Sequence, residues 1–395
     1  AGLVFSGSGG ACGLNVKSNN KLGYHWADTS GSYGWNGGPT LPVNVWSHVV
    51  LVITPTSATI YLNGVPYTRS NTAHPLVAFS SDFRFGRDRT NSSRNFVGQI
   101  DEVAIYNQSM TIDKVRELRH LTRKEGDNLL GYYQFNELSG NAFDKIGSKH
   151  AVLIGEASRE VSTAPLGGGF SKRVTINSGG LKDFTNADLK IYFPSTGNYP
   201  NGEVVATKIN LLPDVFPSGT ILPKSYWVIN NYGTNQSFSI PDSIRFYNSG
   251  NISGGCDSRF YNLFRRLDNG EGNTWGTSID VGENYNPNPP DKFVNFSTGN
   301  NVNSLGQFYV MVDGKPNESV QEICNDIDDD CDGLIDEEYS LFVSSNDDNG
   351  ANSLRAILNC AQNGDIITFN SDVDTITLLS PLVFNKNLTI HDTEG

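Results

Sequence analysis

Short stretches of alternating apolar and polar residues, each bounded by glycine, asparagine or proline, recur along most of this chain. An alternation with a period of two places every second side chain on the same face of a β-strand. Runs with the longer period of an amphipathic helix are rare, and methionine occurs only twice among 395 residues. This pattern predicts an all-β protein of short strands and tight turns, and its length allows two to four domains.

Residues 1–125 are predicted to form most of one β-sandwich. The pair Asn63-Gly64, between two alternating runs, favours a type I′ hairpin because both residues tolerate a positive φ. A short helix is expected at 111–121, with Thr111 capping its amino terminus. The clearest strand candidates are 45–54, 58–63, 83–86 and 96–106.

This region contains, in order, Trp46-Ser-His48, Ile60-Tyr-Leu-Asn-Gly64 and Gly98-Gln-Ile-Asp-Glu-Val-Ala-Ile-Tyr106. The order and spacing of these motifs resemble a laminin-G or concanavalin-like jelly roll. The opening strands of that family are missing before the Gly-rich start of the chain. A sheet edge is therefore expected to be bare unless another segment supplies those strands.

The resemblance implies that loops at one edge of the sandwich bind glycans or proteins. Trp26, Tyr33 and Trp35 lie in a Gly/Ser-rich loop, where exposed aromatic rings can stack on sugar rings, and they are the candidate glycan contacts. Packing of these side chains on their own sheet is an equally open interpretation. Asp101 and Glu102 are interpreted as bracing a turn rather than as metal ligands.

The chain between the first sandwich and the acidic run divides into residues 126–169 and 170–317. Leu129-Leu-Gly-Tyr-Tyr-Gln-Phe-Asn-Glu137 resembles the opening strand of another jelly roll, but its segment is too short for a domain and is predicted to be a partial repeat or linker. Residues 170–317 are predicted to form a second β-sandwich, in which Arg265 and Arg266 point to opposite faces of one strand. Its strands are expected at 190–193, 203–211, 225–232, 242–248, 262–267, 292–297 and 307–312.

Within the acidic loop at 318–338, residues 322–338 hold nine acidic side chains and no basic one. Acidic residues spaced by two and followed by Gly333 match the first half of a calcium loop, although Tyr339 at the twelfth position excludes an EF-hand. Carboxylates without histidine or thiolate suit calcium better than copper or zinc. The predicted Ca²⁺ ligands are Asp328, Asp330, Asp332, the carbonyl of Leu334, Asp336, and Glu337 or Glu338.

Cys324 and Cys331 bracket this run with six residues between them. A disulfide between them would close a short loop and stabilise the fold by about 2–3 kcal/mol. The run resembles the metal-binding motif C-N-x-x-D-D-D-C-D-G-x-x-D-E of secreted bacterial surface proteins, which adds Asn325 to the ligands. A solvated acidic linker is the alternative. The pairing of the other three cysteines, Cys12, Cys256 and Cys360, stays open.

Residues 339–395 are predicted to be the capped start of a right-handed parallel β-helix. An amphipathic helix is expected at 349–361, where it would cap the first rung. The Ser-Leu-Arg run followed by a Gly-Asp-x-Ile-x-Phe strand resembles the start of such β-helices in bacterial surface proteins. Strands are expected at 364–369, 374–379, 381–384 and 387–390.

The net charge is −13, of which nine units come from the acidic run, so no basic face for nucleic acid is expected. No apolar run is long enough for a membrane span. The G-x-S-x-G, H-E-x-x-H and P-loop motifs are absent, which predicts that the chain is not an enzyme.

The predicted function is that of a secreted or cell-surface adhesin or filament protein. Its modules, made rigid by Ca²⁺, would bind glycans or cell-surface proteins, and the protein could self-associate into filaments. The alternative is a set of accessory binding modules of a secreted polysaccharide-degrading enzyme, whose catalytic β-helix would lie beyond this window.

Overall fold

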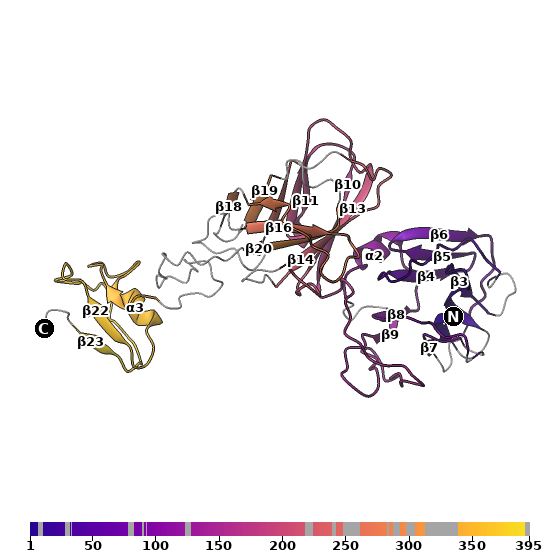
Figure 1. The fold of residues 1–395 in the computed structure, drawn as a ribbon, viewed down its shortest axis with the longest axis horizontal. Coiled ribbons are helices and arrows are strands. Elements are labelled where there is room, and N and C mark those ends of the chain that lie inside the picture. The colour runs from indigo at the N-terminus through magenta and orange to yellow at the C-terminus, as the bar shows by residue number, and fades with distance from the viewer. Residues whose placement is uncertain are drawn as a thin grey trace.

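The protein is an all-β chain of two sandwiches and a smaller carboxy-terminal unit (Figure 1). The two sandwiches lie side by side, with the short helix α2 between them (Figure 1). The computed structural model describes residues 1–6, 11–27, 32, 34–77, 83–88, 91, 93–122, 128–217, 224–238, 242–247, 261–282, 284–286, 293–297, 305–312 and 339–391.

The amino-terminal sandwich has two main sheets around an apolar core. Strands lie in the order β3-β2-β1-β7 in one sheet and β4-β5-β6 in the other. Leu3, Leu14 and Leu22 from the first sheet meet Ile60 from the second. The strands are β1 (Gly2–Ser6), β2 (Cys12–Val16), β3 (Leu22–His25), β4 (Val49–Thr54), β5 (Ser57–Leu62), β6 (Val65–Ser70) and β7 (Phe83–Phe85).

The hairpin between β5 and β6 confirms the predicted turn. Asn63 has φ +52° and Gly64 has φ +80°, and Leu62 pairs directly with Val65 across the two-residue loop. These are the backbone angles of a type I′ turn, whose twist matches that of the flanking strands. The asparagine and glycine therefore set the register of the whole β5–β6 ladder.

A two-stranded ladder of β8 (Val103–Tyr106) and β9 (Leu129–Tyr133) completes this end of the molecule. The strand predicted at 96–106 was too long, because Glu102 adopts φ +53° and an extended strand begins only after it. Strand β9 is the motif that resembles the opening strand of a jelly roll, and it pairs with the last strand of the amino-terminal sandwich.

Helix α2 (Ile112–Glu117) begins at the predicted cap but is shorter than the predicted helix. The Thr111 hydroxyl accepts a hydrogen bond from the Lys114 N–H at 3.3 Å, which satisfies one of the free amides of the first turn. Val115 is fully buried against the sandwich. The helix ends at Glu117, and the next residues run between the two sandwiches.

The second sandwich has the larger core of the two. Its sheets have the orders β10-β13-β14-β20-β16-β17 and β11-β12-β15-β19-β18, and Trp227, Phe246 and Phe308 are buried between them. The strands are β10 (Gly169–Ile176), β11 (Gly180–Phe184), β12 (Leu189–Phe193), β13 (Gly202–Ile209), β14 (Tyr226–Asn231), β15 (Ser243–Tyr247), β16 (Tyr261–Arg266), β17 (Asp280–Val281), β18 (Asn284–Asn286), β19 (Phe293–Phe296) and β20 (Gln307–Val312).

Seven of these strands were predicted to within two residues, whereas β10, β11, β17 and β18 were not predicted. Arg265 and Arg266 lie on opposite faces, as expected for neighbours in a strand. Arg266 is buried and its Nη2 lies 2.6 Å from Asp214 Oδ1, whereas the half-buried Arg265 donates to the Leu305 carbonyl at 3.0 Å.

The carboxy-terminal unit consists of three short parallel strands and one helix. Strands β21 (Phe342–Val343), β22 (Ile366–Phe369) and β23 (Thr389–His391) stack in that order, and helix α3 (Leu354–Cys360) buries Ile357 and Leu358 against them. The strands predicted at 374–379 and 381–384 do not form: Leu379 and Val383 are largely exposed, and no described strand lies beside them to pair with. The β-helix stays a prediction.

Candidate binding site

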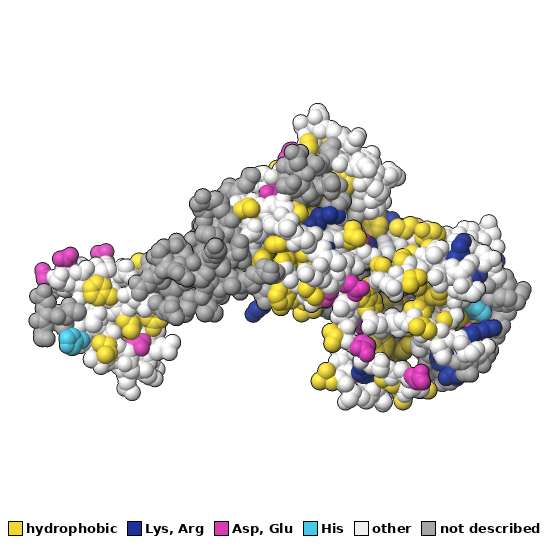
Figure 2. All heavy atoms as spheres, in the orientation of Figure 1, with side chains coloured by type: hydrophobic (Ala, Val, Ile, Leu, Met, Phe, Trp, Pro, Cys, Tyr) yellow, Lys and Arg dark blue, Asp and Glu magenta, His cyan; other side chains and the backbone are white. Residues whose placement is uncertain are grey.

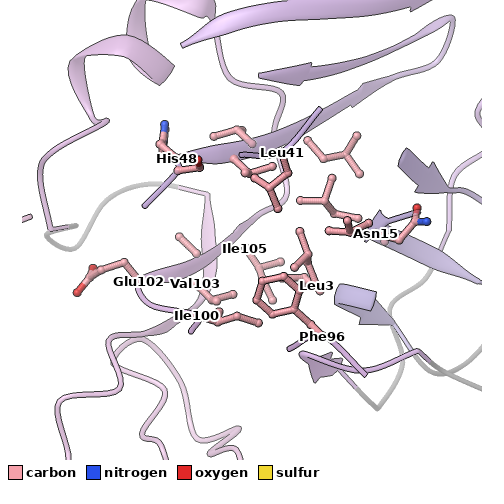
Figure 3. Close-up of a pocket in the computed structure, with 18 of the residues that line it drawn as sticks. Leu3, Asn15, Leu41, His48, Phe96, Ile100, Glu102, Val103 and Ile105 are labelled. Carbon is pink, nitrogen blue, oxygen red and sulfur yellow. The ribbon is translucent and has the colours of Figure 1, made fainter. Parts of the chain in front are cut away.

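An apolar cavity of about 1880 Å³ opens in the amino-terminal sandwich. Figure 2 shows apolar side chains gathered in this hollow, and Figure 3 shows several of them pointing toward one another. Strand β4 forms one wall and β8 the other. Side chains of the sandwich core form the floor, among them Leu3, Leu14, Leu41, Phe96 and Ile100.

Strand β4 turns one row of its backbone groups toward this cavity. The Asn63 N–H donates to the His48 carbonyl at 2.8 Å, so these two residues face each other as a hydrogen-bonded pair. Bonded and non-bonded pairs alternate along an antiparallel ladder. Val49, Leu51 and Ile53 therefore direct their N–H and C=O groups away from β5, and no described strand pairs with β4 on that side.

Strand β8 also has an open edge toward the cavity. Across its ladder with β9, Ala104 pairs with Tyr132. The Tyr132 N–H donates to Asp144 Oδ1 at 3.0 Å and its carbonyl accepts from the Lys145 N–H at 2.8 Å, so the backbone of Tyr132 faces away from β8. Ala104 and Tyr132 therefore form a non-hydrogen-bonded pair of the ladder. The N–H and C=O groups of Ala104 face away from β9, toward the cavity.

The rim of the cavity carries acidic residues that brace the turn into β8. Asp101 Oδ1 accepts from the Glu102 N–H at 2.9 Å. Burial raises the pKa of Asp101. Hydrogen bonds from Ser162 and from the Glu102 backbone lower this pKa, but burial outweighs them. The Glu102 carboxylate accepts from the Tyr132 hydroxyl and points away from the apolar side chains (Figure 3). This agrees with the interpretation of both residues as turn supports.

Two of the three candidate glycan contacts belong to one aromatic cluster. The Trp26 indole N–H donates to the Pro75 carbonyl at 2.8 Å, and its ring meets His74 edge-on at 6.4 Å between centroids. Trp35 lies edge-on to Tyr24 at 5.7 Å and packs on the sandwich core. Tyr33 lies outside the described residues.

Tyr24 and His74 connect the two tryptophans and were missed by the sequence reasoning. The Tyr24 hydroxyl lies 3.0 Å from His74 Nε2, and both residues are buried. Burial lowers the pKa of His74 and raises that of Tyr24, which favours the neutral form of each. Tyr24 stands in an alternating run, which could have predicted that its side chain faces the core. No local sequence pattern marks His74, which lies fifty residues further along the chain.

The predicted calcium ligands in 318–338, together with Cys324 and Cys331, lie outside the described residues. Within the part of the chain that is described, no cluster of three or more His, Cys, Asp or Glu side chains is placed to hold a metal. Cys12 is buried and accepts from the Ala27 N–H at 3.3 Å, and Cys360 is disulfide-bonded. Among the described helices, none is both long and apolar enough to cross a bilayer.

Residues 1–116 match the family model of the concanavalin A-like lectin/glucanases superfamily. No curated protein and no solved structure matches the chain. The match spans β1 to α2, less than a third of the sequence, and confirms the fold that the three motifs predicted. The amino-terminal sandwich is therefore a concanavalin-like module.

Proposed function

We propose that this protein is a non-catalytic adhesin or surface-filament protein, secreted or held at the cell surface, whose concanavalin-like module binds glycans. The observation that carries the proposal is the Trp26 ring, held at the edge of a module of a lectin-type superfamily. The absence of enzyme motifs from the sequence supports the non-catalytic part of the proposal. We also propose that the acidic residues in 318–338 bind Ca²⁺.

Trp26 is the residue of the cluster best suited to contact a sugar. Its side chain is half-buried, and its indole N–H is already bound to the Pro75 carbonyl, so the ring is held in place before a ligand arrives. A ring that is fixed in advance loses little conformational entropy when a sugar stacks on it. Trp35, packed on the core and on Tyr24, supports the cluster from behind.

Affinity electrophoresis of the full chain in gels that contain soluble polysaccharides tests this proposal. Trp26→Ala is expected to weaken retention about tenfold, because loss of one stacking ring removes roughly 1 kcal/mol or more. Tyr67→Ala is the matched control, because Tyr67 is an exposed aromatic residue on β6, outside the aromatic cluster. Equal retention of the wild type and Trp26→Ala on every polysaccharide that binds would contradict the assignment. Release of reducing ends during incubation would instead favour the enzyme alternative.

A further inference from the structure

The outer face of the sheet β11-β12-β15-β19-β18 carries a group of basic and aromatic side chains. Lys190 and Tyr192 alternate with buried core residues along β12, and Arg245 and Tyr247 do the same along β15. Because successive side chains of a strand point to opposite faces, these four side chains stand on the face turned away from the core. Phe293 on β19 joins them, since it pairs with Tyr247.

The two basic residues lie directly opposite each other. Lys190 pairs with Arg245 across neighbouring strands, a position in which like charges destabilise a sheet. Asp183 Oδ2 is 4.0 Å from Lys190 Nζ, and the two side chains are 48% and 30% exposed, so this ion pair is weak. Within the described ranges, no carboxylate pairs with Arg245, whose Nε donates to Asn295 Oδ1 at 3.4 Å. The face therefore holds positive charge that the described residues do not neutralise.

Aromatic rings hold both cations in place. The guanidinium carbon of Arg245 lies 4.2 Å from the centroid of the Phe293 ring and 6.0 Å from that of Tyr192. Lys190 Nζ lies 4.9 Å from the centroid of the Tyr247 ring. A guanidinium that stacks on a ring still directs its N–H donors outward in its own plane, where a carboxylate can accept two of them. Because the rings already restrain both cations, binding an anion costs little further side-chain entropy.

The rings flank the cations on both sides along the strand direction. Tyr192 pairs with Ser243, four residues before Tyr247 on β15. At about 3.3 Å per residue, the two tyrosine positions are separated by roughly 13 Å, with the opposed cations midway between them. This arrangement suits an extended ligand with an anionic group at its centre and a flat apolar surface on either side.

We propose that this outer face is a second binding site, which takes an acidic polysaccharide whose sugar rings carry carboxylate groups. Arg245 and Lys190 bind a carboxylate, and Tyr192 and Tyr247 contact the apolar faces of the neighbouring sugars. The site lies in the second sandwich and does not depend on the glycan contact proposed for Trp26 in the amino-terminal sandwich.

Two other anionic polymers fit this face less well. Strands β12 and β15 each have a paired strand on both sides, so their backbone groups are used and an acidic peptide could not add to them as a strand. A single-stranded nucleic acid carries a charge at every nucleotide and needs cations along its whole path. Here two cations share one row, on a chain with a net charge of −13.

Isothermal titration calorimetry of the full chain with oligogalacturonate tests the proposal, in the presence of EDTA so that calcium contributes nothing. The control ligand is the same oligosaccharide with its carboxyl groups methyl-esterified, which keeps the sugar rings and removes the charge. The acid form is expected to bind at least tenfold more tightly than the ester. Equal affinity for both ligands, or binding of neither, would overturn the proposal. Tighter binding of oligothymidylate with the same number of charges would assign the face to nucleic acid instead.

Charge-removing variants locate the site. Lys190→Gln and Arg245→Gln are each expected to weaken oligogalacturonate binding at least tenfold, because each removes a charge-assisted contact. Lys172→Gln is the matched control: it removes the same charge from an exposed position on β10, in the other sheet, and should bind like the wild type. Circular dichroism verifies that the variants fold. Similar losses in Lys190→Gln and Lys172→Gln would mean that only the overall charge matters, and the site would be refuted.

Trp26→Ala separates this site from the one in the amino-terminal sandwich. It should bind oligogalacturonate like the wild type, whereas Tyr192→Ala should bind it more weakly because one of the flanking rings is lost. If Trp26→Ala loses oligogalacturonate binding and Lys190→Gln retains it, the acidic polysaccharide binds at the first sandwich and the second site is wrong.

Discussion

His120 Nε2 lies 3.0 Å from Asn230 Oδ1, in a buried contact that joins the two sandwiches. The other ring nitrogen, Nδ1, lies 2.9 Å from the Pro165 carbonyl. These two oxygen acceptors favour a charged ring, but burial and the neighbouring Arg119 outweigh them and lower the pKa of His120 to about 3. The ring is therefore neutral in the folded protein at neutral pH.

Acidification is expected to destabilise this junction well above the pH at which carboxylates titrate. Between pH 6.5 and about 3, His120 binds a proton in the unfolded chain but not in the folded one, so the free energy of unfolding falls as the pH is lowered. From pH 6.5 to 5 the loss is about 1.6 kcal/mol. Urea unfolding followed by tryptophan fluorescence measures it, because all five tryptophans lie in the two sandwiches.

His120→Gln should remove most of this pH dependence, whereas His391→Gln, at an exposed position in β23, should leave it unchanged. If the wild type is equally stable at pH 6.5 and 5, the two acceptors hold the ring charged and the neutral assignment is wrong.

Glu203 is expected to hold α2 on the second sandwich. Its carboxylate accepts from Arg116 at 3.0 Å and from Arg173 at 2.9 Å, and it is mostly buried. Glu203→Gln removes the charge that Arg116 and Arg173 share and leaves Arg173 with Asp113 at 2.9 Å, so we expect a loss of about 1–3 kcal/mol in the free energy of unfolding. Glu117→Gln is the control, because its 3.6 Å contact with Arg173 is longer and more exposed. Similar losses in the two variants would contradict the assignment.

Asp144 is expected to hold the loop that follows β9 against the strand. Its Oδ1 accepts from the N–H groups of Tyr132 at 3.0 Å and Ile146 at 3.1 Å. These and further backbone hydrogen bonds lower the pKa of the carboxyl, although burial opposes the shift. Asp144→Ala leaves buried amides unpaired and should destabilise the protein by about 1–3 kcal/mol, measured by the same unfolding experiment. Glu156→Ala, at an exposed position, should change stability by less than about 0.5 kcal/mol.

Calcium binding by the acidic run is measured by isothermal titration calorimetry on the full chain. One Ca²⁺ per chain is expected, and Asp328→Ala combined with Asp330→Ala should abolish the heat because both side chains are predicted ligands. Asp326→Ala removes the same type of charge from a position that is not a predicted ligand and should retain binding. If titration of the wild type with millimolar calcium gives no heat of binding, the acidic run is a linker and not a calcium site.

In the second sandwich, the pattern of residues predicted the interior strands well and the edge strands poorly. Strands β12 and β15 alternate between buried and half-buried residues because neighbours pair with them on both sides and one face lies in the core. Strand β14 is buried on both faces and is recognised as an apolar run instead. Strands β10 and β11 are the first strands of their sheets, and their exposed Phe170, Leu181 and interspersed lysines obscure the alternation.

The candidate site was less accessible to sequence reasoning because its parts come from distant segments. Trp26 and Trp35 were visible as loop aromatics, but their contacts with His74 and Tyr24 depend on how the sheets pack. The open edge of β4 depends on which strands pair, and Ala104 directs its backbone groups toward the cavity only because β9 takes the other side of β8. Local propensity carries no information about such partners.

The contacts around α2 also determine how the molecule would respond to tension between its two sandwiches. Arg116 binds Glu203, Arg119 binds Asp268 at 2.8 Å, and His120 meets Asn230, all within five consecutive residues. Contacts so close along the chain bear a shearing load together instead of breaking one after another. Such a joint would resist pulling up to a threshold and then release at once, which would suit the adhesin that we propose.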